Sequence, residues 1–561
     1  MDRRAFLRRP SPPAPGAGAP LYALPGQRVP DEVASRWRRA RPEATEAARR
    51  VAQQGPEGEP LRLGSGLAPY TPSAEAPWTR ARARHLLKRT SAGAPAAAIT
   101  AFHALAPGEA VDLLVDGALS LAPPADPPWR DDAPPHWSAP QDERDAYWDA
   151  NAERVAQYRF EALDRILARG VAEPVAAAVL SFQERMMRIW HGHIVTDLDS
   201  HFMAPWLFRY WSLVRRHALG NVRTMIHEIG RDPAMLVYLN GVENQAGPDH
   251  QPYVPNENYA RELFELFTMG IDAPDGAPNY TQQDVTEAAR ALSGWGIDYY
   301  GETDTPLDGV FVPAWHDDGV KTLFGQTGPW GYDDVVRLVF EQRGAETAHF
   351  VCRALYRALV YDVADEAIVA QLAAQLQAAD FELAPVVRTL LQSEHFFDAG
   401  LVGAGIKSPI DALYGLWREI GLDPEAEDPD FQGGLNYATK IAGQELFQPP
   451  NVAGWPGGRS WIDTSRLTTR WDTSRWLFWR QDVYRALATQ YPDRWTASVL
   501  AADLAADMLG LPPEPDLLPQ LTELLLNGQP DYEWDPTAES AENRIRQLVA
   551  FLTELPEYQL H

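Results

Sequence analysis

The sequence predicts a mainly α-helical protein: a multi-helical globular body with a small irregular or β-hairpin insertion and a disordered N-terminal arm. From Asp145 onward, segments with helical spacing of apolar residues follow one another, separated by short Gly- or Pro-marked turns. Residues 299–327 interrupt this pattern with an aromatic, Gly- and Asp-rich sequence. Residues 1–77 are rich in Pro, Gly, Ala and Arg and show little apolar periodicity.

The N-terminal arm, residues 1–77, is expected to lack a packed core. Its few apolar residues cannot offset an ordering entropy of about 1–2 kcal/mol per residue. Residues 2–9 resemble the basic region of a twin-arginine export signal, but prolines stand where an apolar segment of about 7–15 residues should follow. A cytoplasmic location is therefore favoured, and twin-arginine export to the periplasm or cell envelope is the alternative.

The main helical domain is predicted to span residues 78–422, and a C-terminal helical region, residues 431–561, is expected to pack on it. An acidic, proline-containing linker at residues 423–430 separates the two. One strand is expected within residues 309–312. The expected helices cover residues 147–168, 174–190, 205–217, 222–228, 256–269, 282–292, 333–341, 346–360, 366–378, 383–393, 409–420, 438–447, 468–489, 498–508, 517–526 and 542–555.

The charge balance limits the function classes. The chain has 77 acidic and 50 basic residues, a formal net charge of −27. Nucleic acids and anionic lipids are bound through Lys and Arg that release counterions, so a nucleic-acid partner is not expected. No apolar window approaches the roughly 18 residues of a membrane span. Cys352 is the only cysteine, which excludes an internal disulfide and a Cys-based metal site.

The first chemistry-bearing segment is the helix expected at residues 256–269, with Asn256 as N-cap and Gly270 as its stop. At about 100° per residue, its polar residues form one arc. An ordinary surface helix with Glu–Arg pairs explains the arc. Alternatively the arc lines a cleft, with Glu262 and Glu265 as candidate catalytic carboxylates and with these candidate binding residues: Asn256, Glu257, Asn258 and Arg261.

A second segment contains His191 and His193. If the helix ends at Trp190, the two imidazoles share one side of an extended chain and could bind a divalent metal such as zinc, copper, iron or nickel. If the helix continues, they diverge by about 200° and simply complement the dipole of the helix C-terminus.

Two loops complete the set of candidates. His316, Asp317 and Lys321 form either an acid–base or metal loop or an ordinary turn built on Asp and Gly. A Pro-, Gly- and Trp-rich loop at residues 443–458, followed by Trp461, either locks a structural corner or presents Trp faces to sugar rings. No Walker A loop, His-Glu-x-x-His or Gly-x-Ser-x-Gly sequence is present.

Six motifs in this order resemble a bacterial family called domain of unknown function 1800, and the resemblance covers roughly residues 80–555. The second motif, Asn-Glu-Asn-Tyr-Ala-Arg-Glu, forms the start of the acidic helix, and in the first an Ile replaces the usual Phe. The motifs lie at residues 190–194, 256–262, 280–285, 293–295, 316–321 and 447–455. They add Trp295 to the candidate binding residues, beside Trp455 and Trp461.

The resemblance implies a partner more clearly than an activity. Genes of this family commonly neighbour those of domain of unknown function 1501, which looks like the alkaline phosphatase/sulfatase superfamily. That association implies a sulfatase-like partner and a glycan ligand. We therefore expect an accessory or binding protein that works with a sulfatase- or phosphatase-like partner. The alternative is a metal-dependent hydrolase with a His/Glu/Asp site in the helical domain. Because residues 256–262 belong to the motif, we also expect their polar arc to face protein.

Overall fold

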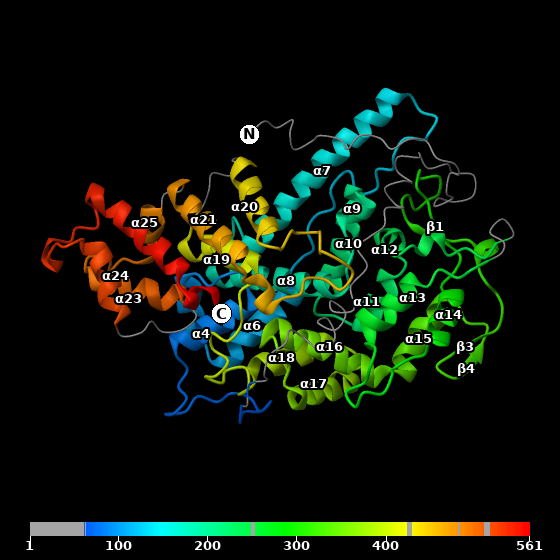
Figure 1. Ribbon diagram of the computed structural model, residues 1–561, viewed down its shortest axis with the longest axis horizontal. Coiled ribbons are helices and arrows are strands. Elements are labelled where there is room, and N and C mark those ends of the chain that lie inside the picture. Colours follow the sequence, from blue (N-terminus) through cyan, green and yellow to red (C-terminus); the bar gives the residue numbers. More distant parts are fainter. Residues whose placement is uncertain (1–60, 62, 248–252, 423–428, 481–482, 510–515) are drawn as a thin grey trace.

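The structure, a computed structural model, describes residues 61, 63–247, 253–422, 429–480, 483–509 and 516–561. Across these residues the chain is mainly α-helical, and its strands form two antiparallel pairs. This confirms the predicted fold class. Figure 1 shows an elongated arrangement, with helices α23 (Ala497–Met508), α24 (Leu517–Leu526) and α25 (Glu539–Glu554) at one end and both strand pairs toward the other.

The centre of the body is α8 (Pro174–His193). Glu173 caps this helix by accepting the N–H of Val175 at 3.1 Å, and Pro174 fills the first turn, where an N–H would have no partner. Most residues of α8 are buried, because at least six of the described helices pack against it. The helices of this part of the chain are α4 (Arg80–Thr90), α5 (Ala96–His103), α6 (Pro107–Ser120), α7 (Gln141–Leu167), α9 (Leu198–His201), α10 (Ala204–His217), α11 (Val222–Ile229), α12 (Pro233–Tyr238) and η1 (Gly241–Glu243).

The acidic helix has two parts, α13 (Asn258–Glu262) and the π-helix η3 (Leu263–Thr268). It begins two positions later than predicted, and Asn256 instead accepts the N–H of Asn258 at 3.1 Å. The wider π-turn is sealed by Thr268, whose hydroxyl donates to the carbonyl oxygen of Leu263 at 2.5 Å. Such π-turns are often found at functional sites. α14 (Gln282–Ala291) packs alongside.

The irregular insertion contains two hairpins. β1 (Trp295–Ile297) pairs with β2 (Gly309–Phe311), with Trp295 opposite Phe311, so the strand expected at residues 309–312 is confirmed. β3 (Lys321–Leu323) pairs with β4 (Gln326–Gly328), a pair that the sequence analysis did not predict. Phe324 and Gly325 form its turn with φ of 49° and 76°, the positive values that a tight two-residue hairpin requires.

The remaining helices link the main body to the C-terminal region. The helix expected at residues 438–447 lies earlier, and the one expected at 468–489 corresponds to two described helices on either side of positions 481 and 482, which lie outside the described residues. Tyr558 donates to the carbonyl oxygen of Ala412 at 2.7 Å, and Arg470 to that of Lys407 at 2.9 Å, so the two parts share buried contacts. The elements are η4 (Pro313–Trp315), α15 (Tyr332–Gln342), α16 (Gly344–Leu359), α17 (Glu366–Ala378), α18 (Leu383–Gln392), α19 (Pro409–Ile420), α20 (Pro429–Ile441), η5 (Gly458–Trp461), α21 (Thr464–Arg480), α22 (Val483–Gln490), η6 (Asp531–Glu533) and η7 (Pro556–Gln559).

Two predicted segments fall partly outside the described residues: positions 1–60 and 62 of the arm, and positions 423–428 of the linker. The described end of the arm, before residue 77, makes contacts with the body. The N–H of Tyr70 donates to the carbonyl oxygen of Gln392 at 2.8 Å, and its ring lies 4.9 Å from that of Phe397. Leu63, Leu67 and Tyr70 therefore pack on the body, whereas most of residues 71–77 are exposed.

Candidate functional site

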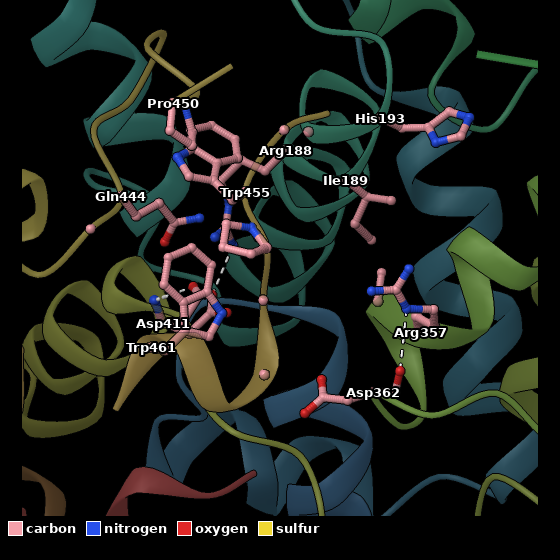
Figure 2. Close-up of a pocket in the computed structure, with 18 of the residues that line it drawn as sticks. Arg188, Ile189, His193, Arg357, Asp362, Asp411, Gln444, Pro450, Trp455 and Trp461 are labelled. Atoms are coloured by element: carbon pink, nitrogen blue, oxygen red, sulfur yellow. Dashed lines mark hydrogen bonds and ion pairs between the residues drawn. The ribbon is translucent and has the colours of Figure 1, made fainter. Parts of the chain in front are cut away.

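A cavity of about 630 Å³ opens where the C-terminal end of α8 meets the loop at residues 443–461. Its other walls come from α16, the π-helix η3 and the segment that leads into α19. Figure 2 shows side chains from these elements arranged around one open space, with Arg188 and Ile189 on α8, Arg357 and Asp362 on one side, and Trp461 and Asp411 on the other.

Two arginines of α8 clamp one carboxylate at the cavity wall. Arg188 Nη2 lies 3.0 Å from Asp411 Oδ1, and Arg185 Nη1 donates to Asp411 Oδ2. The Arg188 and Asp411 side chains are only 4% and 3% exposed. Burial alone would raise the pKa of Asp411, but the two guanidinium groups outweigh it and hold that pKa far below its usual range. Asp411 is therefore a permanent anion with a structural role.

Two more arginines line the cavity near Asp362. Arg89 donates through Nε to the carbonyl oxygen of Leu359 at 2.8 Å, and Arg357 donates to the backbone oxygen of Asp362 at 3.2 Å. Burial lowers the pKa of both guanidinium groups to about 10, which leaves them charged at neutral pH. Burial also raises the pKa of Asp362, against the opposing effect of Arg89 and Arg357.

The cavity is electropositive although the chain is strongly acidic. Lys440 is paired with Glu445 at 2.7 Å, and Arg466 with Asp463 at 3.4 Å. The remaining charges on the wall are four guanidinium groups against two carboxylates, namely Arg89, Arg185, Arg188 and Arg357 against Asp362 and Asp411. The local excess of positive charge favours an anionic ligand.

Several buried N–H groups on this wall have no partner among the described residues. They are Arg89 Nη1, Arg185 Nε, Arg188 Nε and Nη1, and Trp455 Nε1. A buried donor without an acceptor costs about 1–3 kcal/mol, so native structures rarely leave several in one place. These nitrogens are closed to solvent, so an anion would supply their missing acceptors once the arginine side chains shift slightly toward the cavity.

The Trp-rich loop reaches the cavity through a close approach of two backbones. A Cβ on Gly454, whose φ is 78°, would lie 2.0 Å from the carbonyl oxygen of Gly192, and a Cβ on Gly192 would lie 3.4 Å from Trp455 Cε3. Only glycine allows the loop to lie directly on the last turn of α8. Phe447 anchors the loop by packing edge-on against Trp211, with ring centroids 4.7 Å apart. Trp455 and Trp461, both predicted binding residues, thus lie in the cavity wall.

The two histidines do not share a site, because α8 continues through His193 and the imidazoles diverge. His191 packs 4.8 Å from the Trp211 ring, and burial lowers its pKa to about 3. His193 lines the cavity and donates to the carbonyl oxygen of Phe267 at 3.2 Å; burial lowers its pKa to about 4. Within the described ranges, no group of three His, Cys, Asp or Glu side chains could hold a metal ion.

The polar arc of the acidic helix faces protein only in part. Glu262 and Glu265 are buried, Glu257 and Arg261 are half-buried, and Asn258 is exposed. Arg261 lies 2.9 Å from Glu257 and 3.4 Å from Glu265, and Glu257 also accepts hydrogen bonds from Gln282 and Thr286 of α14. None of the predicted residues in this arc lines the cavity; η3 contributes Leu266 instead.

The loop after η4 forms a turn outside the cavity. Asp317 Oδ2 pairs with Arg290 at 2.7 Å, and Lys321 donates to the carbonyl oxygens of Asp317 and Gly319. His316 Nδ1 lies 3.0 Å from the carbonyl oxygen of Ser293, and the Trp295 ring packs against Phe311 and Tyr332. The structure therefore does not bring His316, Asp317, Lys321 or Trp295 together with His193.

Sequence reasoning missed the arginines and acids of the cavity, but one signal was present. Arg185, Arg188 and Gly192 recur at helical spacing on the face of α8 that bears Ile189, where a core helix should be apolar. Charged residues at such positions indicate a buried partner or a ligand.

No helix by itself, within the described ranges, has the length and apolar character to cross a bilayer. Helices α5 and α6 meet that test only when taken together, across a bend of 118°.

Comparisons with known proteins bear on the family alone. No curated protein matches the chain. No solved structure matches it either. A family model described as "Protein of unknown function (DUF1800)" matches residues 85–560, so the chain belongs to the DUF1800 family.

Proposed function

We propose that this protein is a binding protein whose cavity takes an anionic group attached to a ring-bearing ligand. The carrying observation is the set of buried guanidinium N–H groups on Arg89, Arg185 and Arg188 that have no acceptor among the described residues. Arginine presents such donors in a planar fork that matches carboxylate, sulfate and phosphate oxygens.

The aromatic side chains of the cavity support the ring-bearing part of the ligand. Trp455 and Trp461 lie in the wall opposite Arg357 and Asp362 (Figure 2), and Gln444 of the same loop accepts the N–H of Ile410 in α19 at 3.0 Å. Indole faces bind the apolar faces of sugar or aromatic rings, while amide and guanidinium groups fix orientation. A volume of about 630 Å³ is within the usual range for small-molecule sites, about 300–1,000 Å³.

We propose an anionic glycan as the ligand and a sulfatase- or phosphatase-like enzyme as the partner. The support is the match between pocket chemistry and ligand chemistry: an enzyme of that class removes anionic groups, and a cationic pocket flanked by indoles suits the sugar that bears them. The accessory role is tested by measuring the partner's turnover of an anionic oligosaccharide with and without this protein. An unchanged rate contradicts the role.

Isothermal titration calorimetry tests the binding proposal, with glucose, glucose 6-phosphate and glucose 6-sulfate as probes. We expect at least one charged sugar to bind at least about tenfold more tightly than glucose. Arg188→Met should weaken that binding by about 10- to 100-fold, since hydrogen bonds to charged groups contribute about 1.5–3 kcal/mol. Arg216→Met is the matched control, because that side chain is 62% exposed and pairs with Glu228 on the surface.

A second variant keeps the test decisive if Arg188→Met unfolds the chain. Trp455→Ala removes a half-buried ring and leaves the arginines unchanged. It should weaken binding of the charged sugar by roughly tenfold. Equal affinities for glucose and both charged sugars, or an unchanged affinity in both folded variants, contradict the proposed function.

A further inference from the structure

The carboxylate of Asp362 differs from the other carboxylates in the cavity wall. Asp411 is held by Arg185 and Arg188, and Glu445 by Lys440 at 2.7 Å. The side chain of Asp362, in contrast, makes no hydrogen bond and no ion pair with any described residue. Its acceptor oxygens are therefore available to a bound molecule.

The position of Asp362 places it beside the guanidinium groups that would hold an anion. Arg89 and Arg357 are the charged groups that act on it, and both line the same cavity. Figure 2 shows Asp362 and Arg357 on the same side of the pocket, with the carboxylate directed toward the side of Asp411 and Trp461. An anion bound by the arginines would meet N–H donors and one carboxylate acceptor.

We propose that the anionic group selected here is a phosphate monoester, taken in preference to a sulfate ester, with Asp362 accepting a hydrogen bond from the P–OH group. This inference rests on the proposed function and names its ligand class. A phosphate monoester has a second pKa near 6, so near neutrality it can retain or recruit a proton and donate it to Asp362. A sulfate ester has only acceptor oxygens.

The preference for a phosphate over a sulfate ester follows from the hydrogen-bond acceptors that a sulfate leaves without a donor. A sulfate ester held by Arg89 and Arg188 would set its oxygens against those of Asp362 with no proton between them. Two partly desolvated acceptors that face each other lose hydrogen bonds they would make in water. A site that hydrogen-bonds a ligand O–H therefore rejects the analogue that lacks it, by a factor that grows with burial. Because Asp362 is only half-buried, we expect a preference of about 10- to 100-fold.

The experiment compares glucose 6-phosphate with glucose 6-sulfate on the full chain at pH 7, by isothermal titration calorimetry. The phosphate should bind about 10- to 100-fold more tightly. The methyl ester of glucose 6-phosphate, a monoanion without a P–OH group, should bind as weakly as the sulfate. A preference for glucose 6-phosphate over both monoanions also follows from its second negative charge at pH 7, so the variant at Asp362 decides between that charge and the P–OH hydrogen bond.

Asp362→Asn provides the second arm, because an amide can both donate and accept. The ratio of the two affinities should fall toward 1, mainly through tighter sulfate binding, while Asp333→Asn, at a side chain that is 79% exposed, leaves the ratio unchanged. Equal affinities in the wild type, or a ratio that Asp362→Asn does not alter, overturn this inference and leave the proposed function intact. Failure of both charged sugars to bind overturns both.

Discussion

At the end of α8, Arg185 and Arg188 share the single carboxylate of Asp411 and keep N–H groups unused. On the acidic helix, by contrast, Arg261 lies between Glu257 and Glu265. Each region adjoins or contains a family motif, yet only the first places charged side chains on the cavity wall; the acidic helix contributes Leu266 there. Buried charged residues thus form either a closed network or an incomplete one, and the incomplete one is where a ligand is expected.

Breaking the clamp at Asp411 should give the largest effect. Asp411→Asn leaves two buried guanidinium groups without their anion, and we expect a loss of about 3–5 kcal/mol in the free energy of unfolding. Glu257→Gln is the matched change in the second region; its partner Arg261 keeps Glu265 at 3.4 Å and is partly exposed. That variant should lose about 1 kcal/mol or less. Denaturant titration measures both, and equal losses would contradict the comparison.

The backbone contact between loop and helix should rank second. Gly454→Ala sets a methyl group against the carbonyl oxygen of Gly192 at a φ of 78°, and should cost about 3 kcal/mol and displace Trp455. Gly276→Ala, at a φ of 83° with nothing within 4 Å of its Cβ, should cost only the conformational term of about 1 kcal/mol. Thermal unfolding measures the loss of stability in each variant, and calorimetry measures its affinity for the charged sugar. A Gly454→Ala variant with wild-type stability and affinity would contradict the docking of the loop on α8.

The clamp also predicts a pH dependence. The folded-state pKa of Asp411 is depressed, so its contribution is complete above its unfolded pKa near 3.9 and is lost as pH falls through the folded value. Between about pH 4 and pH 3 the wild type should lose up to about 1.4 kcal/mol from this group. Asp411→Asn should lack this component. Parallel stability curves for the two proteins over that range would show that the pKa is not depressed.

The smallest effect is expected inside the closed network. Tyr280 donates to Glu265 at 2.7 Å, and Arg261 also pairs with that carboxylate. Tyr280→Phe should cost about 1 kcal/mol of stability and leave the affinity for charged sugars unchanged. A change in that affinity would link the acidic helix to the cavity and weaken the contrast between the two regions.

Local sequence signals predicted much of the fold. Ser408 and Pro409 mark the start of α19, where Ser408 accepts the N–H of Asp411 at 3.2 Å, and Gly421 ends it at a φ of 72°. The end of α8 was harder to predict from the sequence, because its last turn continues past Trp190. The surface that His191 buries against Trp211 and Trp455 outweighs the helix-terminating tendency of Gly192.

The site could be predicted only in part, for a reason of distance along the chain. Trp455 and Trp461 stood out because a Pro- and Gly-rich loop can present aromatic rings. Arg185 and Arg188 did not, because their helical spacing beside Ile189 indicates a buried partner or a ligand without distinguishing between the two. Their carboxylate partner lies more than 220 positions away, at Asp411.

That separation also has a consequence in time. A ribosome adds about 5–20 residues per second, so Asp411 is synthesised about 10–45 s after Arg188, which precedes it by 223 positions. Throughout that interval Arg185 and Arg188 of α8 lack the carboxylate that pairs with them in the folded protein. If α8 packed in its final position before then, both charges would be buried without a partner. The central helix of the body is therefore completed by the C-terminal third of the chain, and the cavity is among the last parts of the molecule to exist.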